Sequence, residues 1–443
     1  MSEKEKIFDI IIEGGILLTM VDGENPFYNT RIIINGDKIK EVSCQKANPM
    51  PKAKMIINAE NTIILPGMIN AHGHSPMTLF RGWADDLPLN VWLFDRIFPA
   101  EARYINPDTV YWASLLATLE MIASGTTTIV DGYFFADDMA KAIDEAGMRA
   151  IVAQGVIDFP APGVPKPEKN LDIAQCFLER WKNFSDLITP GIFCHSPLTC
   201  SSNTLLKAHE ISKEFNLPLQ IHLSETREEV EEIKKREKKR PVFYLDDLGI
   251  LNGDLIAAHA IYLNEQEIEV LAKRDVKVAH CAESNMKLGS GLAAVTKMLE
   301  KGITVGLGTD GCASNNNLDL FAEMDTAAKL AKVAGLDPTM LNAKTVLSMV
   351  TSKGAGVIGM ADKLGTIESG KKADIIIVDT NSPHMVPVYN PYSQLVYSAC
   401  GGDVRDVLIN GKMVFKDRQF TALDKADIIS RVNRISKGIG YDL

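Results

Sequence analysis

Short apolar runs alternate with turn residues at both ends of the chain. Such runs are typical of β-strands, and Asn-Gly pairs at 35–36 and 410–411 favour tight hairpin turns between them. We therefore expect a small β-sandwich domain that is built from both chain termini, residues 1–64 and 369–443. Its expected strands are residues 8–12, 14–20, 31–34, 39–42 and 55–59 in the first part, and residues 373–378 with a hairpin over 406–415 in the second.

The middle of the chain has a different pattern, in which apolar runs of strand length alternate with longer helical segments. Repeated strand–helix units predict a parallel sheet, and eight of them predict a (β/α)8 TIM barrel. We therefore expect an α/β fold with a metal-dependent barrel at residues 65–368. The eight expected strands are residues 63–69, 127–130, 150–156, 191–194, 219–223, 255–258, 276–279 and 304–307.

Composition and charge narrow the choice of partners. The chain has 57 acidic and 47 basic residues and a net charge of −10, which argues against a nucleic-acid partner. No apolar run approaches the ~18 residues that a membrane span needs. Seven scattered cysteines without a C-x-x-C pair are typical of reduced thiols. We expect a cytoplasmic protein with a small-molecule partner, and a homo-oligomer stays open.

Six of the eight histidines fall in or just after an expected barrel strand. The carboxyl ends of the strands in a barrel meet on one face, where the connecting loops build the active site. Packing alone explains this placement poorly, because each buried imidazole needs a hydrogen-bond partner. These histidines are His72, His74, His195, His222, His259 and His280.

The pair His72 and His74 predicts a metal site. Alternate residues of a strand point to the same side, so His-x-His directs two imidazoles into the mouth of the barrel. With His222 and Asp310 the donors would be three imidazoles and a carboxylate, a set that suits one Zn²⁺ per subunit and leaves room for water. The same donors also accept iron or manganese.

Glu225, His259 and Asp310 are the candidate proton carriers. A metal ion lowers the pKa of water to about 7, and carboxylates and imidazoles beside it can then move protons. Two alternatives stay open: Glu225 as an acid at a helix N-terminus, and Asp310 as a capping residue. The chain has no G-x-S-x-G motif for a nucleophilic serine.

Several motifs together resemble the amidohydrolase superfamily, and the resemblance covers nearly the whole chain. Three of them are residues 65–74 (LPGMINAHGH), 222–225 (HLSE) and 308–311 (GTDG). Residues 81–89, 195–201 and 284–288 are similar to motifs of the 5′-methylthioadenosine/S-adenosylhomocysteine deaminases within that superfamily.

The resemblance implies roles for residues of the site. His72, His74, His222 and Asp310 would hold one zinc ion, and Glu225 and His259 would handle protons. Glu101 would bind the ribose hydroxyls, and His195 would contact the nucleoside. Two positions after the third strand that often reach the far end of the substrate are Gln154 and Lys166 here. Trp92, with Trp83, Phe94 and Phe98, lies in a segment that either covers the cavity or packs in the core.

We therefore expect a hydrolytic deaminase of an adenosine-type nucleoside, which releases ammonia and the inosine analogue. The candidate substrates are 5′-methylthioadenosine, 5′-deoxyadenosine, adenosine and S-adenosylhomocysteine. The alternative is an aminohydrolase or chlorohydrolase of another heterocycle, such as guanine, a pterin or an s-triazine. Glu101 separates the two, because a bare ring has no ribose for a carboxylate to bind.

Overall fold

Eight parallel strands form the centre of the computed structural model, which describes residues 7–43 and 50–439. The strands follow one another around the sheet in chain order. The last strand returns to the first, since the Asp310 N–H donates to the His72 carbonyl over 3.0 Å. The expected barrel is confirmed. Its strands are β6 (Met68–Gly73), β7 (Thr126–Tyr133), β8 (Arg149–Val156), β9 (Ile188–Cys194), β10 (Leu219–Leu223), β11 (Leu255–His259), β12 (Lys277–His280) and β13 (Val305–Leu307).

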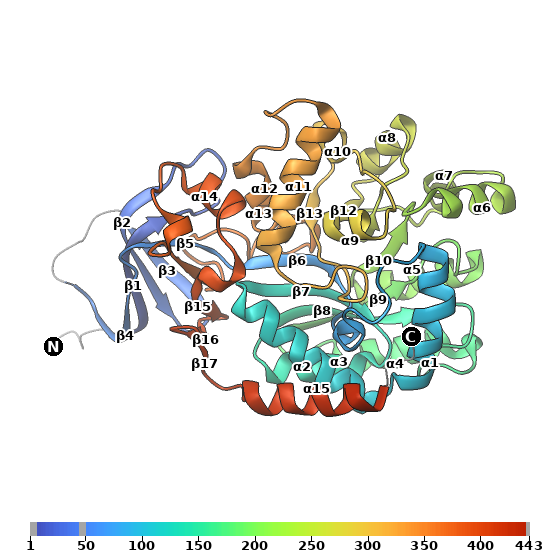
Figure 1. The fold of residues 1–443 in the computed structure, drawn as a ribbon, viewed down its shortest axis with the longest axis horizontal. Helices are drawn as coiled ribbons and strands as arrows, with labels where there is room; N and C mark the ends of the chain where they lie inside the picture. The colour runs from blue at the N-terminus through green and yellow to red at the C-terminus, as the bar shows by residue number, and fades with distance from the viewer. Residues whose placement is uncertain (1–6, 44–49, 440–443) are drawn as a thin grey trace.

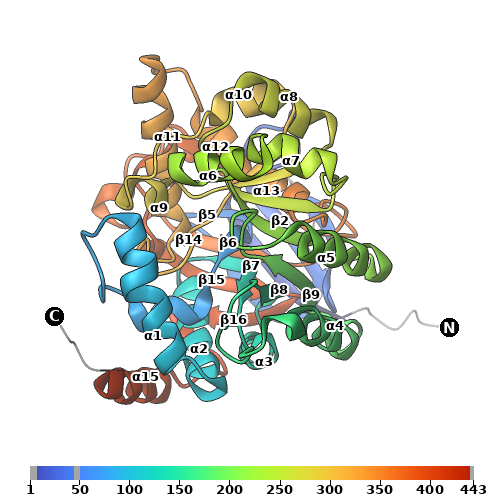
Figure 2. The same cartoon turned by 90° about the vertical axis from the view of Figure 1, so that its right-hand side faces the viewer.

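Helices surround the barrel, as the view in Figure 2 shows. The start of α2 shows capping chemistry: the side chain of Asn106 accepts a hydrogen bond from the Thr109 N–H, and the Thr109 hydroxyl accepts one from the Asn106 N–H. The main helices are α1 (Phe98–Tyr104), α2 (Pro107–Ala123), α3 (Ala136–Glu145), α4 (Asn170–Trp181), α5 (Ser202–Phe215), α6 (Arg227–Glu237), α7 (Pro241–Asp247), α8 (Glu265–Lys273), α9 (Ala282–Lys287), α10 (Val295–Glu300), α11 (Leu320–Gly335), α12 (Ala343–Met349), α13 (Ser352–Val357), α14 (Pro391–Tyr397) and α15 (Lys425–Ile439).

Strands from both ends of the chain form a second, mixed sheet, drawn in blue and red side by side in Figure 1. The sheet branches at β1, which pairs with β2, β4 and β5, and isoleucines from several of its strands share a separate apolar core. The strands are β1 (Ile7–Leu17), β2 (Phe27–Asn35), β3 (Lys38–Ser43), β4 (Lys52–Asn58), β5 (Thr62–Pro66), β14 (Ile375–Asp379), β15 (Val404–Ile409), β16 (Lys412–Lys416) and β17 (Gln419–Phe420).

Gly67 divides the expected strand at residues 63–69 into two. The first part, β5, pairs with β1 and β14 in the terminal sheet, and the second part, β6, begins the barrel. A side chain at Gly67 would meet the Thr127 side chain at 2.2 Å, so the chain needs glycine where it passes between the sheets. The domain limits at residues 64 and 368 stay a prediction.

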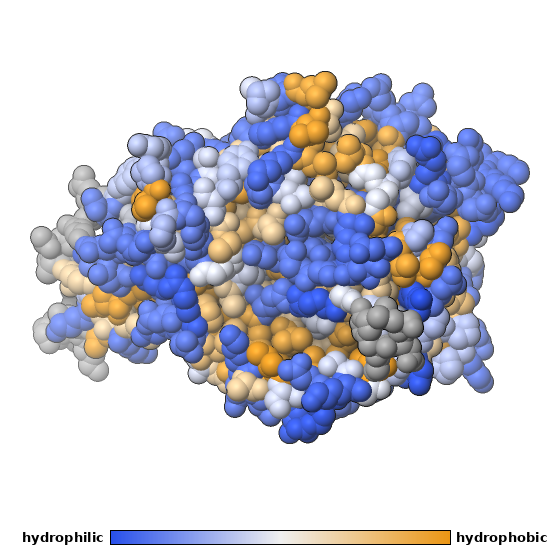
Figure 3. All heavy atoms as spheres, in the orientation of Figure 1, coloured by the Kyte–Doolittle hydropathy of each residue, from blue (hydrophilic) through white to orange (hydrophobic). Residues whose placement is uncertain are grey.

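The surface in Figure 3 is mostly hydrophilic, with apolar side chains gathered over parts of the helices. Among the described residues, no helix is long and apolar enough to cross a membrane. Six of the seven cysteines lie in the described parts of the chain, where each is a free thiol. Cys44 lies outside the described residues.

Candidate active site

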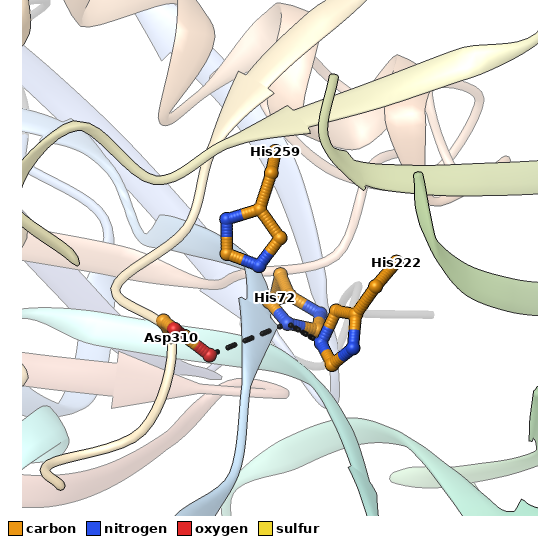
Figure 4. Close-up of side chains that lie close together, drawn as sticks. All are labelled: His72, His222, His259 and Asp310. Carbon is orange, nitrogen blue, oxygen red and sulfur yellow. Dashed lines mark hydrogen bonds and ion pairs between the residues drawn. The ribbon is translucent and has the colours of Figure 1, made fainter. Parts of the chain in front are cut away.

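Four barrel strands bring three imidazoles and one carboxylate together at their carboxyl ends (Figure 4). One ligand atom of each group lies within 4.8 Å of the others; the groups are His72, His222, His259 and Asp310. His222 Nε2 is 3.2 Å from His72 Nε2, and Asp310 Oδ1 is 3.5 Å from the same His72 nitrogen. The strands β6, β10 and β11 and the residues after β13 thus deliver distant parts of the sequence to one point.

His74 lies beside this cluster, with its Nε2 at 3.2 Å from Asp310 Oδ1. Its Nδ1 is 2.6 Å from the Gly132 carbonyl, which can only accept, so this nitrogen carries a proton, and Nε2 is the atom that faces Asp310. Two electron-rich atoms repel at such a distance unless a cation or a proton lies between them. The donor set of imidazoles and a carboxylate fits a divalent cation such as Zn²⁺.

Two hydroxyl groups hold the Asp310 carboxylate. Ser284 Oγ and Ser314 Oγ each donate to Asp310 Oδ2 over 2.7 Å, which leaves Oδ1 to face the histidines. Burial alone would raise the pKa of Asp310, but hydrogen bonds to His72 and His74 outweigh it and hold the pKa well below its usual range. The carboxylate is therefore ionised at neutral pH, as a metal ligand must be.

The backbone around the cluster is strained. Ser224, His259 and Asp310 have φ angles of 51°, 68° and 61°, in the left-handed region that residues with side chains seldom adopt. Strain of this kind costs about 1–3 kcal/mol at each residue and collects at functional sites, where the surrounding packing enforces it.

His259 and Glu225 form a possible proton-carrying pair next to the cluster. His259 Nε2 is 3.8 Å from Glu225 Oε2, and His259 Nδ1 is 2.9 Å from Asn285 Oδ1. Burial raises the pKa of Glu225, although His259 acts in the opposite direction. Glu229 fixes the backbone here, because its carboxylate accepts the N–H groups of Ser224 and Glu225 over 3.0 and 2.8 Å.

A cavity opens above the cluster, and its lining includes His74, His222, His259, Glu225 and Asp310. Most of its lining is apolar, and the polar groups away from the cluster include Glu101 and His195. The Tyr133 hydroxyl donates to Glu101 Oε1 over 2.5 Å, and burial raises the pKa of Glu101 to about 7. His195 Nδ1 lies 2.8 Å from the Thr199 hydroxyl.

The aromatic segment after residue 82 contributes two of its four predicted residues to the cavity. Trp92 and Phe98 line it, from the π-helical turn η2 (Val91–Ile97) and from α1. Trp83 packs against Phe80, with ring centroids 5.9 Å apart. The Phe94 side chain is half exposed to solvent and contacts Phe98.

The structure does not bring Gln154 and Lys166 to the cavity lining. Gln154 is buried. Its side-chain amide accepts a hydrogen bond from the Ala136 N–H, at the start of α3, and donates one to the Gly155 carbonyl. Lys166 is exposed in the loop that precedes the short 3₁₀ turn η3 (Pro167–Lys169). The resemblance implied substrate contact for both residues, and that role stays a prediction.

Sequence reasoning missed the residues that hold the candidate groups in place. Tyr133, Asn285 and Glu229 bind Glu101, His259 and the backbone of Glu225. One of them had a local signal: Thr226 and Glu229 have the spacing of an N-terminal capping box, and Thr226 does cap α6. The Glu229 carboxylate, however, turns to the loop that carries Glu225.

Comparison with known proteins agrees with this geometry. The amidohydrolase family profile matches residues 63–414. A 5-methylthioadenosine/S-adenosylhomocysteine deaminase from Syntrophobacter fumaroxidans is 45% identical over 97% of this chain and 98% of its own length. A 5′-deoxyadenosine deaminase from Methanosarcina barkeri is 42% identical, with coverage of 97% and 98%.

A solved structure has the same fold over nearly the whole chain. It is an adenosine deaminase from Xanthomonas campestris with bound zinc, which matches with a TM-score of 0.95 and 35% identity and covers 98% of this chain and 99% of that one. The resemblance seen in the sequence motifs is thus confirmed, and the chain belongs to the amidohydrolase family.

Proposed function

We propose that this enzyme deaminates an adenosine-type nucleoside by hydrolysis, so that water and the nucleoside give ammonia and the inosine analogue. The observation that carries the proposal is the Glu225–His259 pair, which lines the same cavity as the imidazole and carboxylate cluster and Glu101. The names of the relatives in Syntrophobacter fumaroxidans and Methanosarcina barkeri support the same reaction class.

His72, His74, His222 and Asp310 would hold the metal ion, for which we propose zinc at one site per subunit. The Gly132 carbonyl supports His74 in this role, since a hydrogen bond at Nδ1 directs Nε2 toward the ion. A bound Zn²⁺ supplies Lewis acidity and lowers the pKa of water to about 7. The zinc in the similar adenosine deaminase supports this choice of metal.

The chain's own acids and bases would move the protons. Asp310 and His259 are placed to orient the attacking water and to accept its proton. Glu225 would give a proton to the ring nitrogen beside the amino-bearing carbon, so that the amino group can leave as ammonia. Such positioned proton transfer contributes about 10²–10⁴-fold to a rate.

Glu101 would bind the ribose hydroxyls, and His195 would contact the nucleoside beside it. A buried carboxylate that accepts only one hydrogen bond from the protein, here from Tyr133, retains acceptor capacity for a diol. This placement favours a nucleoside over a bare heterocycle such as guanine or an s-triazine.

The test is ammonia release from adenosine, 5′-deoxyadenosine and 5′-methylthioadenosine by metal-loaded enzyme, with guanine and an s-triazine as comparison substrates. We expect turnover of at least one nucleoside and much weaker turnover of the bare rings. Replacement Glu101→Gln should raise KM for the nucleosides. Absence of nucleoside turnover in protein with bound metal would refute the proposal.

A further inference from the structure

We infer that the cavity selects nucleosides with an uncharged group on the 5′ carbon and discriminates against an amino-acid tail at that position. This inference rests on the proposed function and narrows its substrates. It assigns 5′-deoxy and 5′-alkylthio nucleosides to this chain in preference to S-adenosylhomocysteine.

Glu101 marks the part of the cavity where the 5′ group would lie. The 2′ and 3′ hydroxyls and the 5′ carbon belong to one ribose, so a ribose on Glu101 places its 5′ group within a few ångströms of that residue. Phe134 packs on Tyr133, which binds Glu101, and Phe98 lies 5.9 Å from His195 between ring centroids. The 5′ group would therefore meet an aromatic wall.

Apart from the histidines that would hold the metal ion or lie beside it, the ionisable side chains of the lining are acids and one tyrosine. Glu101, Glu225 and Asp310 contribute carboxylates, and no lysine or arginine of the described residues lines the cavity. The apolar residues of the lining include Trp92, Leu93 and Val156. A substrate carboxylate would lose its water here without gaining a cation, and burial of an unpaired charge costs several kcal/mol.

Basic residues near this end of the barrel are bound elsewhere. Lys287 Nζ lies 2.6 Å from Asp85 Oδ1, and Arg81 pairs with Glu120. Arg149 lies at the opposite end of the barrel, where β8 starts, and pairs with Asp374 at 3.0 Å. Lys166 is exposed and does not line the cavity. Because its side chain is long, the variant Lys166→Ala is the control for a cation that comes from outside the lining.

Packing holds the aromatic wall in place. Phe98 contacts Phe94 and Phe159, with ring centroids 5.5 and 5.4 Å away. The Asp85–Lys287 pair links the segment before η2 to α9. The wall is therefore part of the fold, and a charged tail would have to displace packed aromatic rings to reach a cation.

The experiment compares kcat/KM for four nucleosides: 5′-deoxyadenosine, 5′-methylthioadenosine, 5′-butylthioadenosine and S-adenosylhomocysteine. The butylthio compound is an uncharged match for the length of the homocysteine tail, so it separates charge from size. We expect the three uncharged substrates to agree within about tenfold and S-adenosylhomocysteine to fall at least about 100-fold below 5′-methylthioadenosine.

Two results would overturn the inference. S-adenosylhomocysteine within tenfold of 5′-methylthioadenosine would show that the tail finds a partner, and Lys166→Ala would identify Lys166 as that partner if the activity then disappears. A butylthio compound as slow as S-adenosylhomocysteine would show that length, and not charge, decides. If none of the four nucleosides reacts, the proposed function itself fails, which is a separate outcome.

A matched pair of variants gives an independent test. Leu93 is half-buried in the cavity wall, and Leu93→Arg would add a cation where Leu93→Gln adds only polarity. We expect Leu93→Arg to raise kcat/KM for S-adenosylhomocysteine relative to 5′-methylthioadenosine by about tenfold, and Leu93→Gln to leave the ratio unchanged. If both variants are active and neither changes this ratio of kcat/KM values, the tail does not reach Leu93 and the inference is contradicted.

Discussion

The two ends of the barrel bury charge in opposite ways. At the amino ends of the strands, Arg149 forms two hydrogen bonds with Asp374, of 3.0 and 3.2 Å, and Asn410 N–H also donates to that carboxylate. At the carboxyl ends, Glu101 and Asp131 are buried and form no ion pair with a lysine or arginine of the described residues, and burial raises their pKa values to about 7 and about 6.

The difference teaches what each end contributes. At the amino ends of the strands, the Arg149–Asp374 ion pair joins the barrel to the terminal sheet. Its removal should therefore lower the stability of the fold. The carboxyl groups at the mouth have pKa values near physiological pH, so they can gain or lose a proton there. Their replacement should therefore affect catalysis. The predictions below test this division.

The largest effect is expected from the metal ligands. We predict that His74→Ala loses both bound metal and activity, whereas His259→Ala keeps the metal and loses at least about 10²–10³-fold in kcat. Metal content per chain and kcat of the same samples measure the two effects. The opposite pattern, with metal lost from the His259 variant alone, would assign the ion to the group His72, His222, His259 and Asp310.

At the base, Arg149→Met should lower the free energy of unfolding by about 3–5 kcal/mol, because it leaves Asp374 buried without its cation. The double variant Arg149→Met with Asp374→Asn should regain much of that loss, since no buried charge remains. Denaturant titration measures the change. A large fall in kcat of the folded Arg149 variant would contradict the division between the two ends.

Stability should also depend on pH through Glu101. Its folded pKa of about 7 lies above the ordinary value of 4.5, so the folded state holds a proton that the unfolded state has released between these values. Stability from this group is therefore lost as the pH rises from 4.5 to 7, by about 3 kcal/mol. Glu101→Gln should remove the loss, and unfolding curves of both proteins at pH 5 and pH 8 measure it. Parallel pH profiles would refute this assignment.

The smallest effect is expected from a positioning residue. Asn285→Ala should lower kcat by about 10–100-fold with little change in KM, because the His259 ring would lose the partner of its Nδ1. Asn285→Asp keeps an oxygen acceptor and should retain more activity, with an altered pH profile of kcat. Equal kcat in the wild type and the alanine variant would show that packing alone orients His259.

The sequence predicted the barrel because its strands are buried on both sides and therefore form continuous apolar runs. The bounds of β10 coincide with the predicted segment 219–223. The division at Gly67 was not predicted, because residues 63–69 are apolar throughout and a buried passage between two sheets has the same pattern.

The sequence predicted those site residues that carry a metal-binding or acid–base side chain and stand at the end of a strand. His72, His222 and Asp310 converge as a barrel requires. The roles of Gln154 and Lys166 came from the resemblance alone, and only the fold shows that Gln154 is bonded at the start of α3 and that Lys166 is exposed in a loop. Asn285 and Glu229 act through contacts that exist only in the folded chain, so no local pattern could predict them. The roles of the candidate residues stay predictions until tested.

The hydrogen bond from Asp310 N–H to the His72 carbonyl has a consequence for synthesis of the protein on the ribosome. A nascent chain that ends before β13 (Val305–Leu307) has the first three imidazoles but lacks both the Asp310 carboxylate and the strand that closes the ring. Loading of the proposed ion would therefore have to await translation beyond residue 310, and shorter products of premature termination would remain unloaded.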